Sequence, residues 1–356
     1  MIVPFFISHR GCPHRCVFCD QETISGAPDA LPTADEIVSA VARFRDTSAG
    51  RPLEVAFFGG TFTSLSREDQ ELLLDPIQPM LKSGEIVSIR LSTRPDALCG
   101  ETVEFLRGRG VKTVELGVQS LDDDVLAAAC RGHSADDVKA ACRSVRAGGL
   151  DLGIQLMPGL PFSSRQSDLD SLFGSIALGP DFLRIYPSLV LRGTTLEQMF
   201  RSGGYKPLSL ESAVALCADM LLAAHKAGVP VRRLGLQSST SLEAEGAVVA
   251  GPYHPAFRQL VESELFFRLL LLLASGLPSG THVQLSSSPS RLSDVIGQQR
   301  RNAMRLASEA GVIIDRVMGD TELSNSELIV HTTGGVLQGD LLRDLAIADE
   351  GNYHDR

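Results

Sequence analysis

Apolar positions along the first two thirds of the chain alternate between two spacings. Short apolar runs that end close to glycines or small polar residues are typical of strands buried in a parallel sheet. Between these runs, apolar residues recur every three or four positions, which is typical of amphipathic helices. The strands predicted in this way cover residues 2–7, 53–58, 86–92, 113–118, 151–156 and 182–186.

The segments between these strands predict helices. Thr33 is expected to cap the first helix, because Glu36 three residues later completes a capping box. Six strand–helix units with short connections predict an α/β fold, a partial (β/α)6 TIM-like barrel. Residues 229–234 are a candidate for another strand. The other predicted helices cover residues 66–81, 102–109, 122–129, 134–147, 167–177 and 210–227.

The regular alternation ends near residue 229. We therefore predict two domains, a core barrel over residues 1–235 and a small α+β C-terminal region over residues 236–356. Gly334, Gly335 and Gly339 lack the strand and helix context of a nucleotide-binding fingerprint, so we interpret them as a turn. The elements predicted in the C-terminal region are helices at 255–274 and 299–310 and strands at 281–285, 312–317 and 327–331.

Composition narrows the class of protein. Of the 356 residues, 44% are hydrophobic and 21% are charged, a balance that excludes a disordered chain. The net charge of −10 disfavours a nucleic-acid footprint over the whole surface but is compatible with a local basic patch. The most apolar stretch, residues 265–277, is broken by Arg268 and is shorter than the roughly 20 residues of a membrane span. We expect a cytoplasmic protein without a signal peptide or membrane partner.

Three of the seven cysteines, Cys12, Cys16 and Cys19, lie within eight residues. In a reducing compartment, such a cluster points to metal or iron–sulfur ligation and not to a disulfide framework. Three thiolates on one loop can bind three irons of a 4Fe–4S cubane and leave the fourth iron open. A zinc knuckle completed by His9 or His14 is the alternative. The cysteines outside the cluster, expected to be small core residues, are Cys99, Cys130, Cys142 and Cys217.

The C-x3-C-x2-C spacing, with Phe18 before the last cysteine, resembles the radical S-adenosylmethionine superfamily. Phe58-Gly59-Gly60-Thr61 looks like the glycine motif of that superfamily, whose backbone meets the amino group of the methionine moiety, and glycines permit such a close approach. The likeness covers roughly residues 1–265. The segments that resemble the Elongator catalytic subunit and its bacterial relatives, and more distantly oxygen-independent coproporphyrinogen oxidase, are 91–96, 114–120, 156–161, 184–194 and 251–257.

The resemblance implies a set of site residues. Cys12, Cys16 and Cys19 match the ligands of a 4Fe–4S cluster. Ser92 stands where relatives often carry Glu, and Gln155 stands where the porphyrinogen enzyme carries Asp; both can hydrogen-bond a ribose, but neither supplies a carboxylate. A buried hydrogen bond is the alternative for the glutamines, and a helix cap is the alternative for Arg131. The residues matched to S-adenosylmethionine contacts are Phe6, Phe18, Gly59, Gly60, Thr61, Ser92, Gln119, Arg131 and Gln155.

The chemistry implied by the resemblance is reductive cleavage of S-adenosylmethionine to a 5′-deoxyadenosyl radical, which abstracts hydrogen from an unidentified substrate. The electron would come from a reductant such as flavodoxin or ferredoxin. No acyl-CoA loop of the Gln/Arg-x-x-Gly-x-Gly/Ala type follows residue 265, so acetyl-CoA binding is not expected. Two alternatives stay open: an Elongator-like RNA-modifying enzyme without the acetyltransferase domain, which makes RNA a less favoured partner, and a non-catalytic iron–sulfur protein.

Overall fold

The computed structural model describes residues 1–7, 10–20, 30–239 and 242–347. The chain forms two compact units that interleave along the sequence. The first consists of Met1–Leu208 and Val229–Tyr253, and the second of Ser209–Gly228 and His254–Arg356. The predicted division after residue 235 assumes a single boundary, and whether it separates independently folding domains stays a prediction.

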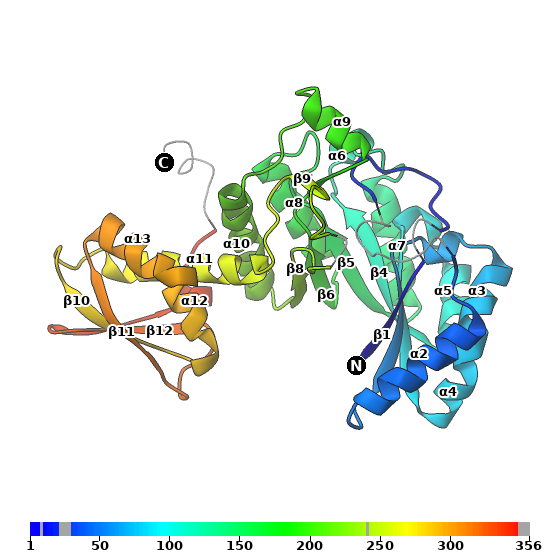
Figure 1. Ribbon diagram of the computed structural model, residues 1–356, viewed down its shortest axis with the longest axis horizontal. Helices are drawn as coiled ribbons and strands as arrows, with labels where there is room; N and C mark the ends of the chain where they lie inside the picture. Colours follow the sequence, from blue (N-terminus) through cyan, green and yellow to red (C-terminus); the bar gives the residue numbers. More distant parts are fainter. Residues whose placement is uncertain (8–9, 21–29, 240–241, 348–356) are drawn as a thin grey trace. The chain divides into compact units, whose positions relative to one another are not determined.

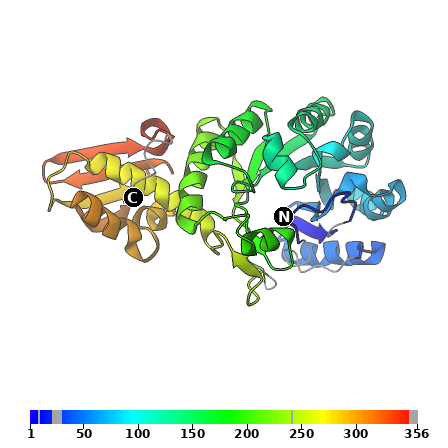
Figure 2. The ribbon, with the colours of Figure 1, turned by 90° about the horizontal axis from the view of Figure 1, so that it is seen from above.

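The first unit is built on a parallel sheet in the order β1-β2-β3-β4-β5-β6-β8. The sheet curls into a half-barrel with helices on its outer side (Figures 1 and 2). This confirms the predicted α/β fold and partial TIM-like barrel, and the candidate strand near residue 229 makes seven strands where six units were expected. The strands are β1 (Ile2–Phe6), β2 (Leu53–Phe58), β3 (Ile86–Thr93), β4 (Val111–Gln119), β5 (Asp151–Leu156), β6 (Phe182–Ile185) and β8 (Val231–Leu234).

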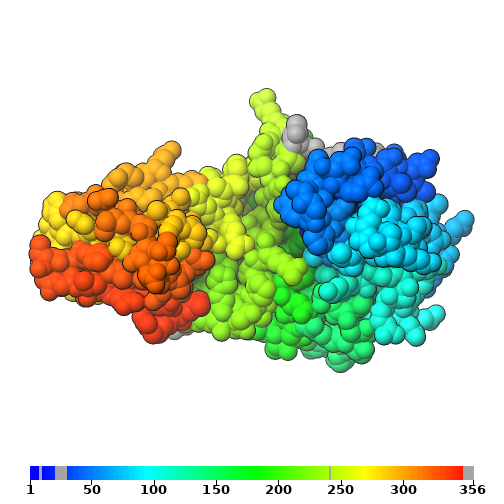
Figure 3. Space-filling view, turned by 90° about the horizontal axis from the view of Figure 1, so that it is seen from below, coloured from blue at the N-terminus to red at the C-terminus, as the bar shows by residue number. Residues whose placement is uncertain are grey.

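Most helices of this unit were predicted, and Thr33 and Glu36 form the expected capping box. The single helix expected over residues 66–81 is interrupted at Pro76, because proline supplies no N–H to the helix and crowds the preceding turn. In the space-filling view, the blue-to-cyan segments from α2 to α5 lie packed together on the surface (Figure 3). The helices are α2 (Ala34–Thr47), α3 (Arg67–Leu74), α4 (Gln78–Ser83), α5 (Gly100–Gly108), α6 (Asp123–Ala128), α7 (Ala135–Ala147) and α8 (Arg165–Ala177).

Three short elements of the first unit were not predicted. Helix α9 (Thr195–Arg201) follows β7 (Val190–Leu191), which pairs with β9 (Val248–Ala250) in an antiparallel ribbon. Strands of two or three residues are too short for an alternating pattern to identify, and β7 and β9 are brought together from positions almost 60 residues apart. Only the tertiary structure reveals them.

The second unit contains α10 (Leu210–Lys226) and α11 (Phe257–Ala274). Its sheet has the order β11-β10-β12-β13, with β10 and β11 parallel and the other pairs antiparallel. The apolar stretch near residue 270 lies in α11, and no helix in the described part of the chain is long and apolar enough to cross a membrane. The other elements are β10 (His282–Ser287), α12 (Leu292–Ile296), α13 (Arg301–Ala310), β11 (Ile313–Gly319), β12 (Glu327–Thr332), β13 (Gly335–Asp340) and α14 (Leu341–Asp344).

The glycines interpreted as a turn belong in part to a strand. Gly334 lies in the turn of the β12–β13 hairpin, as expected, but Gly335 and Gly339 are part of β13. A β-carbon on Gly339 would lie only 2.8 Å from Leu269 Cδ1 of α11. The strand thus approaches the helix closely at this glycine, and a larger residue there would make the leucine side chains of α11 move.

Candidate functional site

The three clustered cysteines lie on the loop between β1 and α2, at the carboxyl end of the parallel strands, where barrels of this kind place their chemistry. All three thiols are free; Cys12 is exposed, and Cys16 and Cys19 are half-buried. The N–H of Cys19 donates to the carbonyl of Cys16 at 3.1 Å, which folds this end of the loop into a turn. The three thiols predicted to bind an iron–sulfur cluster are therefore free, and each has some exposed surface.

The zinc-knuckle alternative needs a fourth ligand that converges with the cysteines. Among the residues that the structure describes, no three histidine, cysteine or acidic side chains surround a point where one ion would bind. The His14 ring lies against Gly132, since a β-carbon there would be 2.4 Å from His14 Nε2, and His9 falls outside the described residues. A cubane places fewer demands on this loop, because each thiolate binds a different iron.

The turn formed by Gly59, Gly60 and Thr61 after β2, here called the glycine turn, is hydrogen-bonded to the start of the cysteine loop. The N–H of Thr61 donates to the carbonyl of Arg10 at 2.9 Å, and Thr61 Oγ1 lies 3.2 Å from the Sγ atom of Cys12. A β-carbon on Gly60 would lie 2.3 Å from the carbonyl oxygen of Ile7 and 2.6 Å from that of Arg10. Gly60 is thus required for packing inside the protein, a role that the motif alone did not indicate; its contact with the cofactor stays a prediction.

Gly11 completes this backbone packing and was missed in the sequence. It has φ +72°, and a β-carbon there would lie 2.3 Å from the carbonyl oxygen of Thr61. Any other residue would be strained and would push the cysteine loop away from the glycine turn. Its position directly before Cys12 was the available signal, because a glycine beside a ligand often marks a constrained backbone.

Arg131 contacts one of the predicted cluster ligands. Its Nη1 atom donates to the Sγ atom of Cys16 at 3.1 Å, and its Nη2 atom donates to the carbonyl of Gly117 in β4 at 2.6 Å. The side chain is buried, and the adjacent Ala129 carbonyl accepts a hydrogen bond from the N–H of Val17. The guanidinium thus joins the cysteine loop to the carboxyl end of β4.

The two predicted glutamines meet at the ends of β4 and β5. Gln155 Nε2 donates to Gln119 Oε1 at 3.2 Å, so the glutamines do hydrogen-bond to each other, although the bond is only partly buried. A β-carbon on Gly117 would lie 2.9 Å from Gln119 Nε2 and 3.4 Å from Arg131 Nη2, which places these two side chains beside the glycine, and Gln155 is its register partner on β5. Each amide retains unused hydrogen-bonding capacity, which a bound molecule can take up.

The backbone conformation of Gln119 supports a ligand-binding role for the polar side chains at the ends of β4 and β5. Its φ of +70° lies in the left-handed region, which costs a residue with a β-carbon about 1–2 kcal/mol. The strain ends β4 and turns the glutamine side chain toward Gly117. Non-glycine residues with this geometry concentrate at binding sites, where the surrounding structure supports them.

The remaining predicted residues lie in different surroundings. Phe6 ends β1 and is partly exposed beside Phe58, with ring centroids 6.1 Å apart. Ser92 is half-buried in β3, next to Glu115 in the register of the sheet. Phe18, by contrast, is buried in an apolar cluster behind the cysteines. Phe6 and Ser92 therefore have accessible surface for a ligand, whereas most of Phe18 is used in packing.

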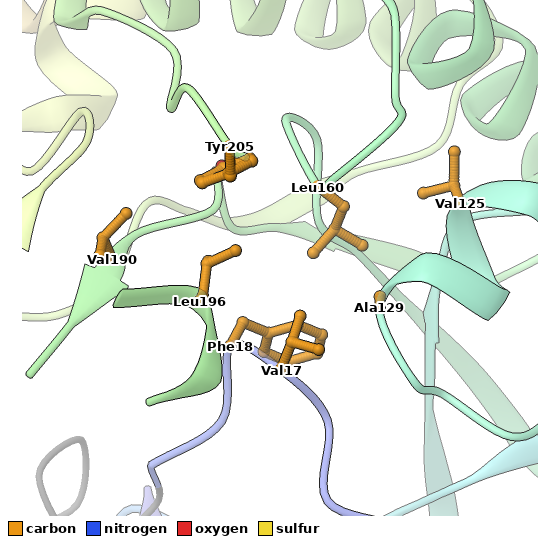
Figure 4. Packing of buried hydrophobic residues seen from close by; sticks show 8 residues of the cluster. All are labelled: Val17, Phe18, Val125, Ala129, Leu160, Val190, Leu196 and Tyr205. Atoms are coloured by element: carbon orange, nitrogen blue, oxygen red, sulfur yellow. The ribbon is translucent and has the colours of Figure 1, made fainter. Parts of the chain in front are cut away.

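An apolar cluster holds the cysteine loop in place, because Val17 and Phe18 of the loop are packed into it (Figure 4). Cys16 and Cys19 pack against it, and the carbonyl of Val17 accepts a hydrogen bond from the N–H of Leu196 in α9 at 2.7 Å. Segments far apart in sequence thus hold the loop. The cluster residues are Val17, Phe18, Val125, Ala129, Leu160, Val190, Leu196 and Tyr205.

A polar clamp holds the loop that carries Leu160 into this cluster. The N–H of Gly159 donates to Asp168 Oδ2 at 3.0 Å, and its carbonyl accepts from the hydroxyl of Tyr205 at 2.6 Å. Asp168 is buried, and this burial raises the pKa of its carboxyl to about 7. Neither residue was predicted from the sequence, because both act through the backbone of a distant loop.

The concave face of the sheet carries a chain of ion pairs. Arg90 contacts Glu54 at 2.8 Å and Glu115 at 2.9 Å, and Arg184 contacts Glu115 at 2.9 Å. Glu115 thus has two arginine partners. Arg184 also donates to the hydroxyl of Tyr186, whose pKa is raised by burial. Buried charges are tolerated here because each carboxylate has guanidinium partners.

Comparison with known proteins is consistent with these features. The model of the radical SAM superfamily matches residues 6–172, and that of the Radical_SAM C-terminal domain matches residues 180–266. The tRNA uridine(34) acetyltransferase of Methanocaldococcus jannaschii is 28% identical over 256 residues, covering 60% of this chain and 47% of that protein. The enzyme of the same name from Dehalococcoides mccartyi is 30% identical over 246 residues, covering 59% and 53%.

Elongator complex protein 3 of Homo sapiens is 30% identical over 192 residues, covering 48% of this chain and 35% of that protein. The chain spans about half the length of the tRNA uridine(34) acetyltransferases that it matches. The structure of Methanocaldococcus infernus Elp3 with an N-terminal deletion has a TM-score of 0.60 and 19% identity, covering 97% of this chain and 75% of that chain, and it shows a shared fold. The chain therefore has a radical SAM domain followed by a Radical_SAM C-terminal domain, and it is homologous to the Elp3 and tRNA uridine(34) acetyltransferase proteins.

Proposed function

We propose that the protein is a radical S-adenosylmethionine enzyme in which Cys12, Cys16 and Cys19 bind a 4Fe–4S cluster. When bound, the cluster and S-adenosylmethionine supply the reductive cleavage that produces a 5′-deoxyadenosyl radical for hydrogen abstraction from a substrate. The observation that carries the proposal is the pair of hydrogen bonds from Arg131 to Cys16 and to the carbonyl of Gly117, because they hold a predicted cluster ligand beside the strand end where the predicted cofactor contacts gather. A flavodoxin or ferredoxin is the proposed reductant.

The residues of the half-barrel bind and orient the cofactor in this proposal. Gly11 and Gly60 hold the cysteine loop against the turn after β2, so that the thiols keep their positions. Gln119 and Gln155 offer amide groups, and Ser92 offers a hydroxyl, which suit the hydroxyls and amino groups of S-adenosylmethionine. The proposed cofactor contacts are Phe6, Phe18, Gly59, Gly60, Thr61, Ser92, Gln119, Arg131 and Gln155.

A second candidate function is a radical enzyme whose substrate is RNA. The tRNA uridine(34) acetyltransferases at 28–30% identity favour it, since their alignments cover about 60% of this chain. In this form of the proposal, the radical domain acts on a nucleoside.

Formation of 5′-deoxyadenosine tests the proposed function. Full-length protein is reconstituted anaerobically with iron and sulfide, reduced with dithionite and incubated with S-adenosylmethionine, and the products are separated by chromatography. We expect 5′-deoxyadenosine and methionine in equal amounts, and slower formation in Arg131→Met than in a variant of an exposed arginine, Arg107→Gln. A cluster-loaded wild-type protein that forms no 5′-deoxyadenosine would support the non-catalytic iron–sulfur alternative instead.

A further inference from the structure

Arginines gather on the concave face where β6 and β8 lie side by side. Arg184 of β6 is the register partner of Arg233 of β8, and the register shifts between Leu183 and Arg184. Such an irregularity changes the alternation of side chains between the two faces. Arg232 accordingly lies over the ring of Phe182, 4.1 Å from its centroid, although it is the sequence neighbour of Arg233.

Phe182 identifies the face on which Arg232 lies. A β-carbon on Gly153 would lie 2.4 Å from the Phe182 ring and 3.1 Å from the side chain of Glu115, so the ring sits beside the ion-pair chain of the concave face. Arg233 lies on the same face, because it is paired with Arg184, and paired residues of neighbouring strands point to the same side of the sheet. Both arginines of β8 therefore flank the same group of side chains.

On this part of the concave face, arginines outnumber the carboxylates that could pair with them. Glu54 and Glu115 are already paired with Arg90 and Arg184, which accounts for both carboxylates. In the part of the chain that the structure describes, neither Arg232 nor Arg233 forms an ion pair or a hydrogen bond with a carboxylate. The other acid on this face, Asp151, lies at the opposite, N-terminal end of β5, in register with Thr113.

Two neighbouring guanidinium groups without anions repel each other and the nearby Arg184. Arg232 is exposed and Arg233 is half-exposed, so an anion from solution can reach both. Arginine forks match the oxygen geometry of phosphates, with two hydrogen bonds from each group. A phosphate would supply the negative charge that this part of the face lacks.

Arg233 also lies close enough to the candidate cofactor site for one bound molecule to reach both. Gly117, Gln155 and Arg184 are consecutive register partners across β4, β5 and β6, and Arg233 continues the row on β8. Adjacent strands are about 4.8 Å apart, so Arg233 is roughly 10 Å from Gln155 across the sheet. A molecule of nucleotide size spans that distance with its phosphate on β8 and its other end beside Gln155.

We propose that Arg232 and Arg233 form a phosphate-binding subsite on the concave face, which anchors a phosphorylated substrate whose reacting part lies toward Gln155 and the cysteine loop. The inference rests on the proposed function for the role of the anchored molecule, but the binding site itself does not. The phosphate belongs either to a small phosphorylated molecule or to the backbone of a nucleic acid. The same two guanidinium groups would bind it in both cases.

Calorimetric titration of the reconstituted full-length protein with inorganic pyrophosphate tests the site, and a short single-stranded RNA is titrated separately. We expect saturable binding by the wild type and at least about tenfold weaker binding by the double variant Arg232→Gln/Arg233→Gln, which loses two charged forks. Arg107→Gln, an exposed arginine on α5, is the matched control and should bind as the wild type does. Arg232→Lys/Arg233→Lys keeps both charges and should recover part of the affinity.

The outcomes separate the two sources of phosphate. Arginine-dependent binding of pyrophosphate supports a small phosphorylated molecule, and arginine-dependent binding of the RNA alone supports a nucleic-acid backbone. Equal binding by the wild type and the folded glutamine variant overturns the subsite, as does a wild type that binds neither probe. Titration uses no reductant, so a failure of the proposed function, seen as absent 5′-deoxyadenosine, is read independently.

Discussion

The two units of the chain use their polar side chains differently. In the second unit, charged groups pair with one another: Asp219 with Arg268 at 2.7 Å, and Glu264 with Arg305 at 2.6 Å. The buried Asn302 likewise donates to Ser263 and to two backbone carbonyls. Such closed networks stabilise and specify a packing arrangement, and they leave little capacity for a ligand.

In the first unit, several polar side chains lack a full set of hydrogen-bond or ion-pair partners. Arg131 directs its charge at a free thiol, Gln119 and Gln155 share only one hydrogen bond, and Arg233 has no carboxylate partner among the described residues. Where such groups are buried, as in Gln119 and Arg131, they are costly in a folded protein unless something binds them. The comparison teaches that incomplete polar pairing, more than the presence of polar residues, marks the half-barrel as the functional unit.

Removal of a thiol should have the largest effect. We expect Cys16→Ala to lose the cluster, because two thiolates cannot hold a cubane in this loop. Iron content and the visible absorbance of the anaerobically reconstituted protein measure the loss. Cys142→Ala is the control, since Cys142 is buried on α7 and its raised pKa disfavours a thiolate. A full cluster in Cys16→Ala would contradict the assignment of the ligands.

A side chain at Gly60 should separate the cysteine loop from the glycine turn. Gly60→Val is expected to lower the melting temperature and cluster loading together, with a cost of about 3 kcal/mol, because the backbone oxygens of Ile7 and Arg10 cannot yield to a β-carbon. Thermal unfolding and iron analysis measure both effects. Gly100→Ala is the matched control, because its β-carbon has open space. Normal loading of Gly60→Val would refute this packing role.

The pH dependence of stability should reveal the clamp on Gly159. The pKa of Asp168 is raised by burial to about 7 in the folded protein, above the unfolded value near 3.8, so the folded state binds its proton more tightly. This group therefore favours folding most at low pH, and that contribution is lost as the pH rises from about 4 to 7. We expect Asp168→Asn to be more stable than the wild type at pH 8, by about 1–3 kcal/mol, since no charge is buried.

Denaturant titrations of the wild type and Asp168→Asn between pH 5 and pH 8 measure this difference. The gap between the two proteins should widen with rising pH. Tyr205→Phe serves as the control for the other side of the clamp, because it removes the hydrogen bond to Gly159 without a titrating carboxyl. Parallel curves for the wild type and Asp168→Asn would mean that Asp168 does not titrate in this range.

The smallest effect should come from the second unit. Arg305→Gln removes a partly exposed arginine from Glu264 and Glu309, and such surface pairs contribute up to about 1 kcal/mol. We expect a small fall in the free energy of unfolding and no change in cluster content. Denaturant unfolding and iron analysis check both values. A loss of iron in Arg305→Gln would show that the closed networks also serve the site, which would break the comparison.

The sequence by itself determined the local elements and the chemistry of the cysteine loop. Buried strands and amphipathic helices have periods that a short window contains, so the strands of the half-barrel were predicted almost residue for residue. The spacing of Cys12, Cys16 and Cys19 is also local, and three thiols on one loop restrict the chemistry before any fold is known. The same reasoning failed for β7, β9 and α9, whose patterns are too short to read.

Only the tertiary structure decided which distant residues meet. Arg131 and Cys16 are 115 positions apart, and their contact depends on the turn after α6 reaching the loop after β1. The collision that makes Gly60 indispensable involves backbone oxygens some 50 positions away, and the pairing of Arg184 with Arg233 depends on the register of two strands separated by a long helix. Such contacts arise from the packing of whole elements, and a periodic pattern along the chain carries no record of the partner across the sheet.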